Sequence, residues 1–101
     1  MEPNEQLVII ELEVLLGQYL ETYTEASSMN AVKSKIAAHI HDKQGQGIAK
    51  LMSFMYLVDV KEELFKDTLQ NVPEAEQPNT LAQLVIDRLL QKVYTRLQYR
   101  K

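Results

Sequence analysis

The chain has 101 residues, of which 46% are hydrophobic and 25% are charged, and it contains no cysteine. This balance is typical of a globular protein rather than a disordered one, and the length predicts one domain, residues 1–101, with a single core. Without cysteine the chain can form neither a disulfide framework nor thiolate ligation of a metal. Three glycines and three prolines are too few for the turns of an all-β domain of this length, so composition favours helices.

The first predicted helix covers residues 5–26, after the helix-start signal Pro3 and Asn4. Its apolar side chains recur at three- and four-residue steps and form one wide face, which consists of Val8, Ile9, Leu12, Leu15, Leu16, Tyr19, Leu20 and Tyr23. Leu7, Ile10 and Val14 fall on the other side of this helix, beside Gly17. This second stripe predicts a second contact surface.

A second helix is predicted over residues 29–43, with Ser27 or Ser28 as its cap. It has a narrower apolar stripe, formed by Met29, Val32, Ile36 and Ile40. The sequence Gly45-Gln46-Gly47 follows, and paired glycines predict a turn because they destabilise a helix and adopt positive φ readily.

The third predicted helix covers residues 48–71 and includes the most apolar stretch of the chain, Leu51–Val60. We expect the other elements to pack around this stretch. A strand is the alternative for residues 51–60, but the helical spacing continues to Leu69 and favours a helix. One face is formed by Leu51, Phe54, Met55, Val58, Phe65 and Leu69, and a second by Tyr56, Leu57, Val60 and Leu64. A helix with two apolar faces is typical of a bundle centre or a subunit interface.

Residues 71–79 contain Pro73 and Pro78 and predict an exposed loop, after which Asn79 or Thr80 caps a fourth helix over residues 80–99. The stripe of this last helix consists of Ala82, Val85, Ile86, Leu89, Leu90, Val93 and Leu97. The four segments together predict an all-α fold, a four-helix bundle-like single domain.

No motif in the sequence predicts catalysis or metal binding. His39 and His41 are two residues apart, so on a helix their rings project in opposite directions and cannot share a metal. The Gly45–Gly47 segment lacks the remaining residues of a phosphate-binding loop. Glu62 and Glu63 are adjacent and diverge on a helix, which does not favour paired acid and base roles. We therefore expect no enzyme activity, no catalytic or metal-binding residue and no cofactor.

The two ends of the chain carry opposite charge. Residues 1–32 contain six glutamates and no lysine or arginine, whereas residues 80–101 contain five basic residues and one aspartate, a net charge of +4. Four of the basic residues are spaced four apart and form one ridge of the last helix, called here the basic ridge: Arg88, Lys92, Arg96 and Arg100.

Two interpretations of the basic ridge differ in function. A phosphate-binding strip would make the protein a nucleic-acid-associated regulator. Charge complementarity to an antiparallel first helix would instead place Arg96 and Arg100 near Glu5 and Glu11. The net charge of the whole chain is −3, which favours the second interpretation and leaves nucleic acid as the alternative.

The sequence thus predicts a small non-catalytic protein-interaction or assembly module that forms a homodimer or binds another protein. The candidate interface residues are Leu7, Ile10, Val14, Met52, Tyr56 and Val60. No basic residue precedes Lys33, and charged residues interrupt every apolar run short of a membrane span. These patterns predict a cytoplasmic protein without a membrane anchor.

Overall fold

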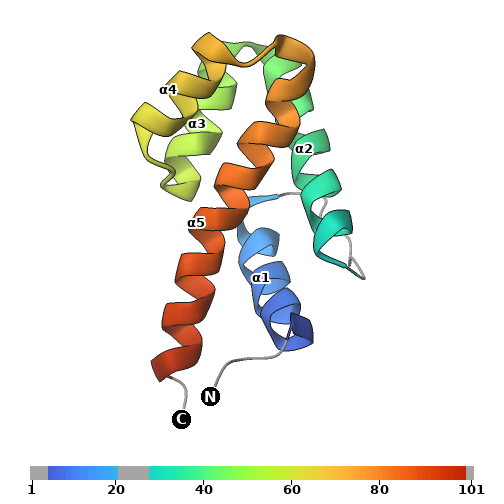
Figure 1. The fold of residues 1–101 in the computed structure, drawn as a ribbon, viewed down its shortest axis with the longest axis vertical. Helices are drawn as coiled ribbons and strands as arrows, with labels where there is room; N and C mark the ends of the chain where they lie inside the picture. Colours follow the sequence, from blue (N-terminus) through green and yellow to red (C-terminus); the bar gives the residue numbers. More distant parts are fainter. Residues whose placement is uncertain (1–4, 21–27, 100–101) are drawn as a thin grey trace.

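The computed structural model describes residues 5–20 and 28–99, in which every regular element is a helix (Figure 1). The elements are α1 (Glu5–Tyr19), α2 (Met29–Gln46), α3 (Ile48–Val58), α4 (Glu62–Asn71), the short 3₁₀ helix η1 (Glu74–Glu76) and α5 (Gln77–Tyr99). The predicted all-α class is confirmed. The predicted four-helix arrangement is not, because the described residues form five α-helices.

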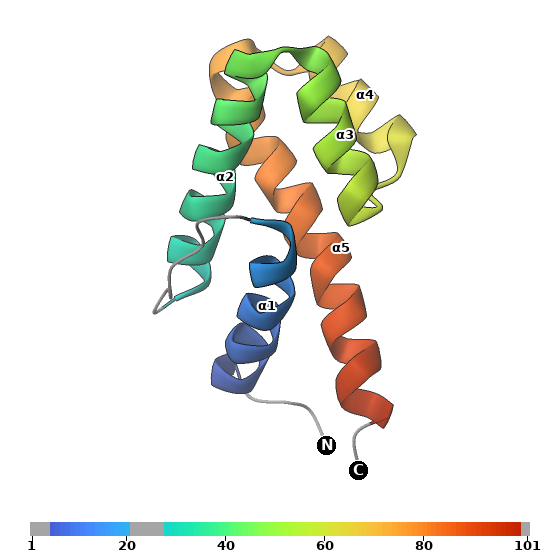
Figure 2. The same ribbon diagram turned by 180° about the vertical axis from the view of Figure 1, so that it is seen from behind.

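Helix α5 occupies the centre of the fold. It runs along the long axis of the molecule and contacts α1, α2, α3, α4 and η1 (Figures 1 and 2). Helices α1 and α2 point in the same direction, and α5 runs antiparallel to both. The expectation that Leu51–Val60 would be the central element is therefore wrong, because the 23-residue α5 is the longest helix and reaches all of its neighbours.

The first two helices follow the predicted pattern with different ends. Helix α1 ends at Tyr19, and the predicted extension beyond Leu20, which includes Tyr23, lies outside the described residues. Helix α2 begins after Ser28, whose hydroxyl accepts a hydrogen bond from the Ala31 N–H at 3.2 Å. It continues to Gln46, three residues past the predicted end, because Gly45 and Gln46 remain helical.

The turn between α2 and α3 consists of Gly47 alone, at φ 117°. This positive φ requires glycine, since a β-carbon is strained there. The α2–α3 turn therefore uses one of the two glycines that predicted it.

The predicted single helix over residues 48–71 is divided at residues 59–61. Asp59 adopts the left-handed conformation (φ 71°, ψ 40°), and the N–H groups of Asp59 and Val60 donate to the carbonyls of Tyr56 and Met55. This pair of hydrogen bonds closes the C-terminus of α3. The chain then reverses, and α4 returns beside α3 (Figure 1).

The predicted loop over residues 71–79 is also shorter than expected. Only Val72 and Pro73 separate α4 from η1, and α5 begins at Gln77 instead of after a cap at Asn79 or Thr80. Pro78 lies in the first turn of α5, where proline is tolerated because its missing N–H would have no helical acceptor.

The buried apolar residues form one core cluster to which all five α-helices contribute. Every apolar position on the predicted inner faces of α1, α2, α3 and α5 that the structure describes is either buried or packed against this cluster. The core is consequently continuous across the break at Asp59.

Candidate functional site

The basic ridge is engaged by the chain itself, beginning with Arg88. Its Nε donates to the Asp59 carbonyl oxygen at 3.1 Å, and its Nη2 forms an ion pair with Asp59 Oδ2 at 2.8 Å. The hydrogen bond from the guanidinium, together with its charge, lowers the pKa of the Asp59 carboxyl. Arg88 therefore binds both the backbone carbonyl and the carboxylate of Asp59, the residue that follows the last turn of α3.

Lys92 lies one turn further along α5 and reaches the same helix end. Its Nζ donates to the Val58 carbonyl oxygen at 3.3 Å and to the Tyr19 hydroxyl at 3.4 Å, and it lies 5.7 Å from the centroid of the Tyr19 ring. The C-terminus of a helix carries partial negative charge, so Arg88 and Lys92 together stabilise the end of α3.

Arg96 joins α5 to α1. Its Nη1 lies 3.5 Å from Oε2 of Glu11, whose side chain is buried. The predicted proximity of Arg96 to Glu11 is confirmed, and it follows from the antiparallel packing of α1 and α5. Arg100 lies outside the described residues, as does the side chain of Glu5. Each of the three described cations of the basic ridge thus has an acidic or carbonyl partner within the protein.

A second apolar surface of α1 is partly exposed in the described part of the chain. Leu7, Ile10 and Val14 are 38%, 51% and 52% exposed, and Gly17 continues their stripe toward the end of the helix. These four residues are called here the outer face of α1. Isolated exposed apolar residues are common in folded proteins, but an aligned group that lacks charge is typical of the centre of a protein interface.

The other three candidate interface residues are placed differently. Met52 is half-buried and packs against the core, and Val60 is buried within it. Tyr56 is half exposed, but its ring meets Phe65 edge-on at a centroid distance of 5.4 Å. Desolvation and a hydrogen bond to Glu62 raise the pKa of the Tyr56 hydroxyl. The structure therefore divides the predicted interface residues between the outer face of α1 and contacts internal to the α3–α4 pair.

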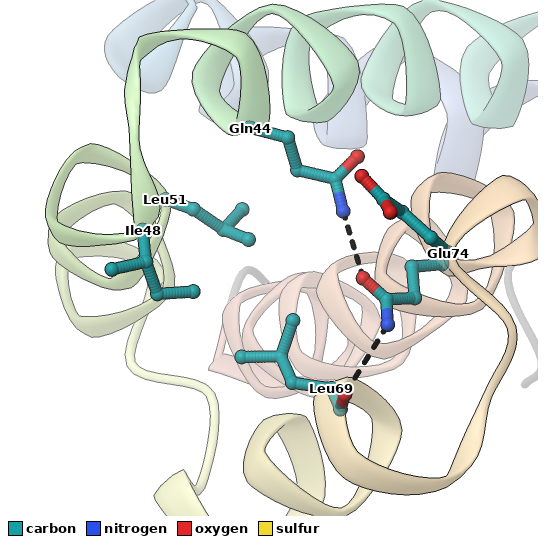
Figure 3. Close-up of a pocket in the computed structure, with 6 residues that line it drawn as sticks. Gln44, Ile48, Leu51, Leu69 and Glu74 are labelled. Carbon is teal, nitrogen blue, oxygen red and sulfur yellow. Dashed lines mark hydrogen bonds between the residues drawn. The ribbon is translucent and has the colours of Figure 1, made fainter.

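Sequence reasoning missed a pocket at the opposite end of the molecule from the termini (Figure 3). Its volume is about 310 Å³, and its lining consists of Gln44, Ile48, Leu51, Leu69, Glu74 and Gln77. Gln77 is buried, and its Nε2 donates to the carbonyls of Leu69 at 3.3 Å and Val72 at 3.0 Å. Its Oε1 accepts a hydrogen bond from Gln44 Nε2 at 2.9 Å.

No sequence signal identifies this pocket, because Gln44 and Gln77 are 33 residues apart and meet only through the turns between them. The hydrogen bonds satisfy both ends of the Gln77 amide. The polar side of the pocket is therefore a structural tie between α2, α4 and α5.

The residues considered for chemistry remain separate in space. His39 packs its ring against Phe54 at 4.8 Å, whereas His41 is exposed on the other side of α2. Glu62 forms an ion pair with Lys66 on the same helix. Among the described residues, no group of three or more histidine, aspartate or glutamate side chains could hold a metal ion.

The fold and these surfaces define a small all-α protein whose described residues expose an apolar stripe on α1 and further apolar side chains on α3 and α4. Comparison with family models, with curated proteins and with solved structures finds no match to the chain. Within residues 5–20 and 28–99, no helix combines the length and apolar composition needed to cross a membrane.

Proposed function

We propose that the protein is a small non-catalytic interaction module that associates with a second copy of itself through the outer face of α1. The observation that carries the proposal is the exposure of Ile10 and Val14, each about half accessible, on the side of α1 opposite its core residues. The other side of α1 already packs on α5, so the second stripe has no role in the core. Burial of aligned apolar side chains between two copies would remove them from water.

The flanks of this face fit an interface as well. Gln6 and Gln18 are exposed at its edges, and Glu11 is turned inward toward Arg96. A polar rim around an uncharged apolar centre is the usual arrangement of a protein interface. Another protein with an apolar helix face is the second kind of partner.

Association through the basic ridge has less support. A phosphate-binding strip needs cations that point into solvent, whereas Arg88, Lys92 and Arg96 contact Asp59, the end of α3 and Glu11. Binding nucleic acid would require these contacts to be exchanged for phosphates. The proposal also places the protein in the cytoplasm, in keeping with a chain that has no cysteine.

Sedimentation equilibrium over a concentration series tests the proposed self-association. We expect the average mass of the wild type to rise toward that of a dimer, and Val14→Glu to abolish the rise because a carboxylate would be desolvated in the contact. Leu57→Glu is the matched control, since it makes the same kind of change at a side chain that is 59% exposed on α3.

Both variants should retain the helical circular dichroism of the wild type, because both side chains project from the surface. A wild type that remains monomeric at every concentration would contradict self-association. Loss of the dimer in Leu57→Glu but not in Val14→Glu would contradict the assignment to α1.

A further inference from the structure

We propose that residues 59–61 are a hinge at which α3 and α4 join into one continuous helix, and that two copies of the chain thereby exchange their C-terminal parts. The exchanged part is the α4–α5 unit, residues 62–99, which packs on the α1–α3 unit of the partner subunit. The proposal goes beyond the contact through α1, because it concerns a second and slower way in which the protein pairs with itself.

The sequence at the break between α3 and α4 is the first argument. Residues 48–71 contain neither glycine nor proline, the residues that commonly end a helix. The chain turns instead at Asp59, in a left-handed conformation (φ 71°) that is strained for a residue with a β-carbon. Meanwhile the apolar spacing of a helix continues from Leu51 to Leu69. The spacing therefore favours one helix where the structure has two, and a short strained connection of this kind favours exchange.

The packing of the helices is the second argument. Helix α4 packs more extensively on α5 than on α3, and Gln77 at the start of α5 donates hydrogen bonds to the carbonyls of Leu69 and Val72. Helix α2 packs extensively on α3, to which Gly47 alone connects it. The break at residues 59–61 thus lies between two units of the chain, α1–α3 and α4–α5.

A second copy is the partner because it supplies the surfaces that the two units already use. Helix α5 packs on α1 and α2, Arg96 pairs with Glu11, and Gln44 donates a hydrogen bond to Gln77. All of these contacts join the α1–α3 unit to the α4–α5 unit, so an exchange forms each of them again between the copies. The contacts of the monomer and of the exchanged dimer therefore differ chiefly at the hinge.

Apolar side chains beside the hinge are the third argument. Tyr56 and Leu57 precede it, Leu64 follows it, and each of the three is about half exposed. In a continuous helix Leu57, Val60 and Leu64 are three and four residues apart, so they share one face. The hinges of the two copies lie side by side in an exchanged dimer, because only three residues connect each α3 to its α4. The shared face is then covered by the same face of the partner subunit.

Exchange is slow, which separates it from the contact through α1. Helices α4 and α5 must leave the core, and with them fully buried side chains such as Phe65 and Leu89. The monomer and the exchanged dimer therefore interconvert only through extensive unfolding, and they remain separate during gel filtration. A contact through the outer face of α1 requires no unfolding and dissociates on dilution.

Two substitutions of Asp59 test the hinge, and both remove the carboxylate that pairs with Arg88. Alanine favours a continuous helix and is strained in the left-handed conformation, whereas glycine adopts that conformation readily and destabilises a helix. Each variant is refolded from urea at the same high concentration and analysed by gel filtration with light scattering. We expect the ratio of dimer to monomer to be at least about tenfold higher in Asp59→Ala than in Asp59→Gly.

Spin labels at Lys50→Cys and Gln70→Cys, in a chain with no other cysteine, show whether the units have exchanged. Both residues are exposed, and their neighbours Leu51 and Leu69 line the same pocket, so the labels are close together in the monomer. In a continuous helix they are roughly 30 Å apart. Labelled chains are mixed with an excess of unlabelled chains before refolding, so that pulsed electron paramagnetic resonance measures the distance within one chain. We expect the long distance in the dimer.

A dimer of Asp59→Ala that retains the short distance would overturn the exchange, as would equal ratios of dimer to monomer in the two variants. Should Asp59→Ala fail to fold, the refolded wild type decides, because we expect it to contain a minor dimer that persists on dilution and has the long distance. Refolding of the wild type without such a dimer would overturn the hinge.

Val14→Glu, added to Asp59→Ala, separates this proposal from the contact through α1. We expect the slowly dissociating dimer to persist, because the exchanged contacts do not use the outer face of α1. Its loss in this double variant would contradict the exchange, whereas a wild type without a rapidly dissociating dimer would contradict only the proposed contact through α1.

Discussion

Asp59 determines where the longest apolar segment of the chain is interrupted. Among the described residues it is the one non-glycine residue with a positive φ, a conformation that aspartate tolerates better than most residues. Its backbone N–H closes α3, while its carbonyl and carboxylate accept hydrogen bonds from Arg88. The Arg88 side chain of α5 thereby contacts the connection between α3 and α4.

The contact between Asp59 and Arg88 should make stability depend on pH. The pKa of Asp59 is lower in the folded protein, so the contact stabilises the fold above the ordinary pKa of an aspartate, about 4. This contribution is lost as the pH falls from that value through the lowered pKa. We expect the difference in unfolding free energy between the wild type and Asp59→Asn to be constant near neutral pH and to shrink below about pH 4.

Urea unfolding at a series of pH values measures this difference. Arg88→Gln is the matched variant, because it removes the cation and leaves Asp59 in place, and it should give the same profile. A difference that persists unchanged to pH 3 would show that backbone preference, and not the ion pair, accounts for the effect of Asp59→Asn.

At the scale of helices, apolar periodicity predicted the inner faces but not the boundaries. The spacing of apolar residues across 48–71 gives no sign of the break. Val58 before the break and Phe65 after it are both buried in the core, as they would be in a continuous helix. Arg88, the residue that contacts the break at Asp59, is 29 residues away in sequence. The predicted start of α5 is wrong because Pro78 indicates a loop in the sequence, although proline is also common in a first helical turn.

The candidate surfaces were predictable to different degrees. The outer face of α1 follows from helical spacing alone, because α1 is a regular helix with one core side. Met52 and Val60 could not be placed from the sequence, since the reversal at Asp59 turns Val60 into the core. The pocket around Gln77 depends entirely on tertiary contacts.

The buried amide of Gln77 connects the start of α5 to the end of α4, a connection called here the α4–α5 joint, and we expect it to contribute to stability. In Gln77→Glu a carboxylate of the same shape replaces a donor to the Leu69 and Val72 carbonyls, so two acceptors lose their partner. We expect the free energy of unfolding to fall by about 1–3 kcal/mol, measured by urea denaturation at neutral pH.

Gln91→Glu is the control on the same helix. Gln91 is exposed, and its Oε1 accepts a hydrogen bond from Arg88 that a carboxylate can also accept. This variant should differ from the wild type by less than about 0.5 kcal/mol. An equal effect of the two substitutions would mean that the hydrogen bonds of Gln77 do not hold the joint.

At the scale of the whole molecule, the contacts are unequally distributed among the helices. Helix α2 packs extensively against both α5 and α3, whereas among the described residues the one extensive contact of α1 is with α5. The ion pair between Arg96 and Glu11 belongs to that same contact. Helix α1 is thus joined to the fold along one side.

We therefore expect α1 to open locally at a lower free energy than global unfolding. Native-state hydrogen exchange, measured at a concentration where the protein is monomeric, should show the slowest amides in the middle of α5 and in α2. The amides of α1 should exchange faster. Equal protection of α1 and α5 would indicate that the helices unfold as one unit.

The central position of α5 also bears on how the protein is made. Helices α1 to α4 precede α5 in the chain, yet their apolar faces are covered largely by it. At about 5–20 residues per second of synthesis, roughly 4 to 17 seconds separate the addition of Val8 from that of Val93, with which it shares the core. During that interval on the ribosome the apolar side of α1 lacks its partner. We therefore expect that folding of α1 onto the core is completed only after α5 has been synthesised.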